Sequence, residues 1–205
     1  MMGILRANYG DGFYRVQNGG GWRKFGKLAH EERARITCLT GHMPWTVGQF
    51  VPGPKRYAVM LRDPVDRVAS LYWFCRHFRA HRWHTYAMRC TLAQFAVGRA
   101  FADLDNGITR WLAGREDVGS LKIKRMLTDE DVRIAMAHLQ TASVGFVRSF
   151  KQSVGTWACE FGWRHTKAQR KQALHYPRPT KAERRIIAEY NRFDVALYEW
   201  AREAA

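Results

Sequence analysis

The apolar residues between positions 57 and 75 change their spacing at one point, and the change predicts a strand followed directly by a helix. Ala58-Val-Met-Leu61 is a continuous apolar run of strand length, which is typical of a strand buried on both faces of a parallel sheet. After Asp63-Pro64, apolar side chains recur at helical spacing, at Val65, Val68, Ala69 and Tyr72. Asp favours the N-cap and Pro the first helical position, so the helix is expected to begin at once.

The rest of the chain alternates between the same two patterns. Further strands are predicted at 35–40 and 143–147, and helices at 28–34, after Thr91, after Thr128 and from Ser149 to Phe161. Positions 3–7 are expected to end a helix, and 10–21 to form a loop. Thr180-x-x-Glu183 is a capping-box sequence and predicts one last long helix with Ile186, Ile187, Tyr190, Val195, Leu197 and Tyr198 facing inward. The alternation predicts an α/β fold with a mostly parallel sheet.

Composition narrows the class of protein. The length of 205 residues and the hydrophobic fraction of 46% fit a single domain over 1–205. No apolar run reaches the roughly 18 residues of a membrane span, and the first residues lack the layout of a signal peptide. The four cysteines lack C-x-x-C spacing and are expected to be free thiols. We therefore expect a cytoplasmic protein without a transmembrane segment.

The net charge of +16 indicates an anionic partner. Such a field attracts polyanions by steering and by counterion release. Nucleic acid, acidic polysaccharide, anionic lipid and a highly charged nucleotide all satisfy this condition, and charge alone does not choose among them.

The segment 57–74 resembles the 3′-phosphate-binding motif of sulfotransferases that use PAPS (3′-phosphoadenosine 5′-phosphosulfate). In that family L-R-D-P-x-x-R-x-x-S-x-Y follows a strand, and its first Arg and its Ser hold the 3′-phosphate. The resemblance implies that Arg62 and Ser70 bind the nucleotide. A guanidinium offers phosphate a planar fork of donors, and the hydroxyl adds one more. The alternative is an ordinary strand–turn–helix with a capping Asp and a solvated Arg.

Gly41-His42-Met43-Pro44 resembles a G-H-M-P sequence of the same family. In members similar to heparan sulfate 2-O-sulfotransferase, this His is the base that acts on the acceptor hydroxyl. The resemblance therefore implies a catalytic role for His42. A histidine that titrates near neutral pH suits proton removal from a sugar hydroxyl. The alternative is a His that only forms hydrogen bonds in a turn at a strand end.

The segment 105–114 resembles the family's N-x-Q-T-R-x-L-x-G sequence, with Ile108 in place of Gln. Asn106 and Arg110 are candidates to line the cofactor or acceptor site. The alternative, which the sequence leaves equally open, is an amphipathic helix that ends at Gly114. The strand at 143–147 and the last helix also resemble family segments, so the resemblance extends along most of the chain.

A basic segment separates these motifs. His77, His81 and His84 have the helical spacing of metal ligands. No carboxylate occurs between Cys75 and Cys90, and the arginines there would repel a cation, so no metal site is expected. A basic rim for an anionic acceptor and a solvated helix end both remain open.

One family element is missing from the 205 residues: the P-K-x-G-[TS] loop that cradles the 5′-phosphosulfate. Gly19-Gly20-Gly21 lacks the G-K-[ST] ending of a phosphate loop. We expect an N-terminally truncated carbohydrate sulfotransferase of P-loop-kinase-like α/β fold, lacking its first strand and phosphosulfate loop. Its partners would be PAPS as co-substrate and a carbohydrate acceptor. The alternatives are a catalytically dead PAP-binding or scaffold protein and a basic nucleic-acid-binding module.

Overall fold

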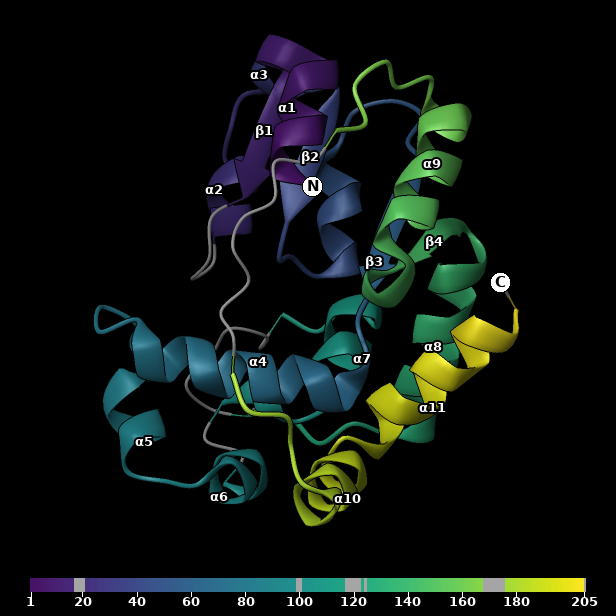
Figure 1. Cartoon of the computed structure of the whole chain (residues 1–205). Coiled ribbons are helices and arrows are strands. Elements are labelled where there is room, and N and C mark those ends of the chain that lie inside the picture. Colours follow the sequence, from purple (N-terminus) through teal and green to yellow (C-terminus); the bar gives the residue numbers. More distant parts are fainter. Residues whose placement is uncertain (17–20, 99–100, 117–122, 124, 168–175, 205) are drawn as a thin grey trace.

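Two pairs of parallel strands, surrounded by helices, form the framework of the protein (Figure 1). The computed structural model describes residues 1–16, 21–98, 101–116, 123, 125–167 and 176–204. Strand β1 (Phe13–Val16) pairs with β2 (Cys38–Gly41), and β3 (Tyr57–Leu61) pairs with β4 (Ala142–Phe146). The predicted α/β class and parallel pairing are confirmed.

The prediction of one continuous parallel sheet is not met in the described part of the chain. Each of the four strands has a single strand neighbour there. β2 and β3 therefore do not pair with each other, and the two strand pairs remain separate. Tyr57 lies opposite Ala142, and Leu61 lies opposite Phe146. The strand β3 is apolar along its length, yet Ala58 is exposed and Val59 and Met60 are only half-buried.

The helices were largely predicted by their end signals. The helices before β3 are α1 (Met2–Tyr9), α2 (Gly21–Gly26) and α3 (His30–Ala34). Those between β3 and β4 are α4 (Pro64–His77), α5 (His84–Met88), α6 (Leu92–Val97), α7 (Gly107–Leu112) and α8 (Asp129–Gln140). Those after β4 are α9 (Phe150–Phe161), α10 (Lys181–Tyr190) and α11 (Arg192–Glu203). Short 3-10 turns occur at Gly10–Gly12, Trp45–Phe50, Ala102–Leu104 and Val147–Ser149.

Two predicted elements are corrected by the structure. The segment 10–21, predicted as a loop, contains β1, because Phe13-Tyr-Arg-Val16 is a short β-prone run between glycines. The predicted last long helix is two helices, α10 and α11, divided at Asn191. Asn191 is fully buried, and its side chain donates to the Ile187 carbonyl and accepts from the Asn106 N–H.

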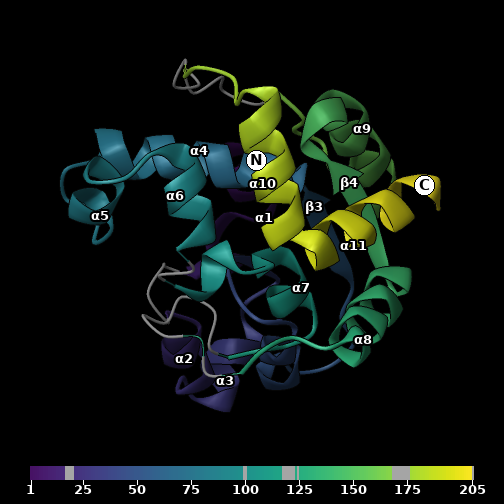
Figure 2. The same ribbon diagram turned by 90° about the horizontal axis from the view of Figure 1, so that it is seen from below.

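The buried apolar residues form three clusters rather than one. The first lies between α4, α5, α6 and α10, around Val68, Tyr72 and Phe95. The second joins β3 and β4 to α7, α8 and α11, around Leu61, Leu139 and Leu197. The third covers the β1–β2 pair with Val16, Trp22, Phe25 and Val47. Figure 2 shows α10 and α11 next to each other on the underside of the molecule.

The turn Trp45–Phe50 connects the two strand pairs. The Trp45 ring stacks on Tyr57 at 4.0 Å and on His138 at 4.5 Å between centroids. At Gly48 an added Cβ would lie 2.1 Å from the Tyr57 hydroxyl oxygen, so only glycine allows this approach. No helix in the described ranges is both long and apolar enough to cross a bilayer.

Candidate functional site

Arg62 lies where β3 ends and α4 begins, as the sequence predicted. Its Nη2 donates to the hydroxyl of Tyr176 at 2.7 Å, and its side chain is half-buried. Tyr176 is 114 residues away in the chain and packs against the first apolar cluster. Arg62 is therefore held at the strand end by a neutral partner, which leaves its positive charge available to an anion.

The first turn of α4 carries two carboxylates that affect anion binding. The Asp63 side chain accepts from the Asp66 N–H at 2.9 Å, which is the predicted N-cap, and Pro64 occupies the first helical position. Arg184 of α10 bonds to Asp66 at 3.2 Å and lies 4.0 Å from Asp63. Negative charge at a helix N-terminus offsets its attraction for anions. An anion bound here would therefore depend on Arg62 more than on the helix itself.

Ser70 lies in the second turn of α4 and is half-buried. Its hydroxyl makes no hydrogen bond with any described residue. It is six residues beyond Pro64, which corresponds to about 9 Å along a helix axis. The hydroxyl is thus a donor without a protein partner in the described chain, on the helix that follows Arg62.

Arg67, which the motif contains but to which no role was assigned, joins three segments. Its Nη2 donates to the Asp103 carbonyl at 2.7 Å and lies 3.5 Å from an Asp194 carboxylate oxygen. An added Cβ at Gly107 would lie 3.0 Å from its Nη1. The Nε is buried without a partner in the described chain. Contacts over such separations along the sequence leave no local signal, and only the family pattern could have indicated this residue.

His42 follows β2 directly and lies beside Trp111, near the end of α7. Its ring centroid lies 6.2 Å from that of Trp111. Burial lowers the pKa of His42 and is the largest effect; Arg67 and Arg15 lower it further, while Asp103 raises it. The His42 side chain is exposed at the surface, but the protein atoms around it displace part of the water that would hydrate the charged imidazole. A lowered pKa keeps the ring neutral, and so able to accept a proton, at pH 7.

The ends of β1 and β2 and the first turns of α4 thus lie close to one another. Arg15 near the end of β1 and Arg67 after β3 are both close enough to His42 to shift its pKa. Of these two arginines, Arg67 is paired with Asp194, so Arg15 is the one that could meet an anion beside His42. Parallel strands commonly present ligands at this edge.

Asn106 and Arg110 have their polar groups bound inside the protein. The Asn106 side-chain oxygen accepts from the N–H groups of Phe193 and Asp194, and its backbone has a φ of 52°. Arg110 is 0% exposed and bonds to Asp105 and to the Arg125 carbonyl. This geometry favours the structural alternative for both residues, while their proposed role at the cofactor stays a prediction.

Asn106 also borders a cavity of about 270 Å³ that lies apart from the other candidates. Neither His42, Arg62 nor Ser70 lines it. Its lining consists of Asp105, Asn106, Met126, Leu127, Glu189, Tyr190, Arg192 and Phe193. This cavity therefore does not join Asn106 to the proposed 3′-phosphate ligands, and the role of Asn106 stays a prediction.

Asp194 holds α7, α11 and Arg67 together. Its carboxylate accepts from the Ile108 N–H at 3.0 Å, the Thr109 N–H at 2.7 Å and the Thr109 hydroxyl at 2.8 Å, and it is fully buried. Burial raises the pKa of Asp194, and Arg67 and these donors oppose that rise. The side chain thus fixes Arg67 relative to the beginning of α7.

Replacing Asp194 with Ala is expected to lower the free energy of unfolding by roughly 3–5 kcal/mol, the usual cost of breaking a buried ion pair. The change leaves Arg67 and two backbone N–H groups without their acceptor. Urea unfolding followed by circular dichroism measures it. The matched control is Glu199→Ala, an exposed carboxylate on the same helix, which should change stability by less than about 0.5 kcal/mol. Equal effects of the two substitutions would contradict the assignment.

The three histidines of the basic segment have separate partners. His81 Nδ1 lies 3.2 Å from Cys75 Sγ, His84 Nδ1 lies 2.9 Å from the Cys75 carbonyl, and His77 Nδ1 lies 2.8 Å from the Trp73 carbonyl. Within the described ranges, no group of three or more His, Cys, Asp or Glu side chains is placed to hold a metal ion. The four cysteines are free. Of the glycine run, positions 19 and 20 lie outside the described residues.

Comparison with protein-family models, with curated proteins and with solved structures finds no match to this chain. The family resemblance therefore rests on the sequence motifs alone.

Proposed function

We propose that the protein is a PAPS-dependent sulfotransferase that transfers a sulfuryl group to a hydroxyl of a carbohydrate. The observation that supports it most is the placement of Arg62 and Ser70 on a strand–turn–helix, of which a further residue, Arg67, lies close enough to His42 to shift its pKa. The R-D-P turn is built as the motif requires: Asp63 caps α4 and Pro64 begins it. Burial, more than the neighbouring charges, lowers the pKa of His42 and so favours the neutral form that a base requires.

In the proposed reaction, residues of this chain have two tasks. Arg62 and Ser70 bind the 3′-phosphate, and Arg62 exchanges its bond to the Tyr176 hydroxyl for bonds to phosphate oxygens. His42 accepts the proton of the acceptor hydroxyl as the oxygen attacks sulfur. One sulfur–oxygen bond forms, the bond from sulfur to the 5′-phosphate oxygen breaks, and PAP leaves with that electron pair. Such in-line transfer depends on positioning and on charge stabilisation at the leaving group.

We also propose that the two strand pairs belong to one parallel sheet of P-loop-kinase-like type. A further strand between β2 and β3 would give both a second neighbour. The half-exposed apolar side chains of β3 support this proposal, because apolar runs of that kind are normally buried on both faces.

Arg62→Ala is expected to weaken PAP binding by roughly 1.5–3 kcal/mol, the range for charged hydrogen bonds. Ser70→Ala should cost less, because a hydroxyl contributes a neutral donor. Calorimetry with PAP and with 5′-AMP measures both changes, since 5′-AMP lacks the 3′-phosphate. The matched control is Arg56→Ala, an exposed arginine just before β3 that pairs with Glu160. Equal losses for PAP and 5′-AMP would show that Arg62 does not read the 3′-phosphate.

A second function is favoured by the net charge of +16: binding of nucleic acid without catalysis. It predicts affinity for generic DNA that falls steeply with salt concentration. PAP bound tightly at a salt concentration that abolishes DNA binding would exclude it. A PAP-binding protein without turnover is the remaining alternative, which the absent phosphosulfate loop favours.

A further inference from the structure

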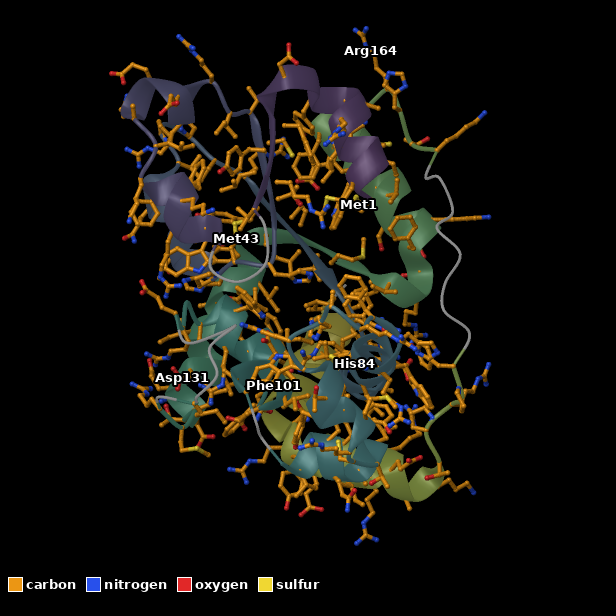
Figure 3. The ribbon with its side chains drawn as sticks, turned by 90° about the vertical axis from the view of Figure 1, so that its left-hand side faces the viewer. Met1, Met43, His84, Phe101, Asp131 and Arg164 are labelled. Atoms are coloured by element: carbon orange, nitrogen blue, oxygen red, sulfur yellow. The ribbon has the colours of Figure 1, made fainter. Side chains whose placement is uncertain are left out.

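The end of α4 carries an exposed pair of aromatic rings. Phe74 and Phe78 lie one helical turn apart, with ring centroids 5.6 Å from each other. They are 42% and 50% exposed, although phenylalanine is among the residue types most often buried. This end of α4 and α5 projects away from the strand pairs and from both termini (Figure 1). Figure 3 looks onto it, with His84 and Phe101 labelled.

The surroundings of the two rings are basic. Residues 74–90 contain four arginines and no Asp or Glu. Arg79, Arg82 and Arg89 are exposed, and none of them forms a salt bridge with a described residue. Arg76 is instead half-buried and bonds to the Tyr72 hydroxyl and the Ala87 carbonyl. We call Phe74, Phe78, Arg79, Arg82 and Arg89 the α4 tip.

The Phe74 and Phe78 rings are not part of the buried apolar cluster beside them. The neighbouring Trp83 points inward and stacks on Phe101 at 4.0 Å. Tyr72 and Cys75, on the other face of α4, belong to the buried cluster. Other aromatic side chains therefore fill the core at this place, and the two exposed rings do not contribute to its packing.

We propose that the α4 tip docks on an anionic lipid bilayer. The Phe74 and Phe78 rings would enter the boundary between headgroups and acyl chains, and the arginines would lie at the level of the headgroup phosphates. Apolar side chains bordered by basic ones are the usual composition of surface-bound membrane anchors. A bilayer can interact with both the phenylalanine rings and the arginines of the α4 tip, whereas a free phosphate would interact with the arginines only. The proposal does not depend on the sulfotransferase activity.

Vesicle sedimentation tests the proposal. The protein is mixed with vesicles of phosphatidylcholine alone or of phosphatidylcholine with phosphatidylglycerol. We expect the protein to bind the anionic vesicles and to bind the neutral vesicles more weakly. Added salt should weaken binding to the anionic vesicles, because the screening length falls from ~10 Å at 0.1 M to ~3 Å at 1 M. Phe74→Ser/Phe78→Ser should weaken binding about tenfold or more. Arg79→Gln and Arg82→Gln should each weaken it about fivefold.

Matched controls separate the tip from total charge and from total exposed apolar area. Val147→Ser removes an exposed apolar side chain elsewhere, and Arg185→Gln and Arg202→Gln remove exposed charges on α10 and α11; all three should bind as before. Phe74→Trp/Phe78→Trp should strengthen binding, because Trp favours the interface, and this gain does not depend on how the Ser variant folds.

Three results would overturn the proposal. One is the absence of binding to anionic vesicles. Another is an equal loss of vesicle binding in the α4 tip variants and in the control variants. The third is a Phe74→Ser/Phe78→Ser variant that keeps vesicle binding but loses single-stranded DNA in an anisotropy titration, which would assign the rings to base stacking.

Discussion

His42→Ala is expected to lower turnover by about 10²–10⁴-fold, the usual contribution of a general base, in a form of the protein that also carries a phosphosulfate loop. The loss arises because no other side chain would remove the proton from the attacking hydroxyl. Affinity for PAP should change little, because in the proposed site the 3′-phosphate is bound by Arg62 and Ser70 and not by His42. Initial rates of transfer from labelled PAPS and calorimetry with PAP measure the two effects.

The pH dependence of the same reaction gives an independent test. Protonated His42 cannot accept a proton, so turnover should fall as the pH drops through its pKa, which lies below the ordinary value of about 6.5. Asp103 raises that pKa, so Asp103→Asn should move the acid limb of the profile to lower pH. His77→Ala, an exposed histidine at the far end of α4, is the control and should leave the profile unchanged. Near-normal turnover of His42→Ala would remove His42 from the mechanism.

Local signals explain which parts of the fold the sequence predicted. The first residues of α4, α6 and α10 could be predicted from their N-caps, Asp63, Thr91 and Thr180. Each N-cap side chain accepts a hydrogen bond from the backbone N–H three positions later in the chain. The division of α10 from α11 could not be read in this way. It depends on Asn191 and Asn106, which are 85 residues apart and bond in the interior.

The same distinction holds for the site. The R-D-P motif indicated Arg62 and Ser70, because the turn and the helix start are encoded within a few residues. Tyr176 as the partner of Arg62, and Arg67 as the residue that joins Asp103 and Asp194, depend on contacts between distant segments. The burial of Arg110 likewise depends on Asp105 and Arg125 together, and sequence spacing alone left its role open.

The polypeptide of 205 residues is expected to transfer no sulfate by itself, and this prediction follows from what its site contains. The proposed site has donors for the 3′-phosphate, but the 205 residues contain no P-K-x-G-[TS] sequence that would bind the 5′-phosphosulfate. Donors at the leaving group meet the charge that develops there, and such stabilisation is usually the largest catalytic effect. With one end of the nucleotide held, the sulfur is not aligned for in-line attack. We therefore expect weak PAP binding and no measurable turnover.

The structure adds a second reason, which concerns the sheet. β2 and β3 each have one strand neighbour in the described chain, and unpaired strand edges favour association between molecules. Low solubility is the expected consequence. A strand placed between them would bury Ala58 and Val59 and would carry its loop to the carboxyl edge, beside Arg62 and His42.

The experiment extends the chain at its N-terminus with a designed apolar strand followed by P-K-x-G-[TS]. The extension should restore transfer from PAPS and slow hydrogen exchange at the β3 amides. The matched control replaces only the Lys of that loop with Ala: it should keep the slowed exchange, because the strand still pairs, but lose most of the turnover. Robust PAPS-dependent transfer by residues 1–205 alone would refute the prediction.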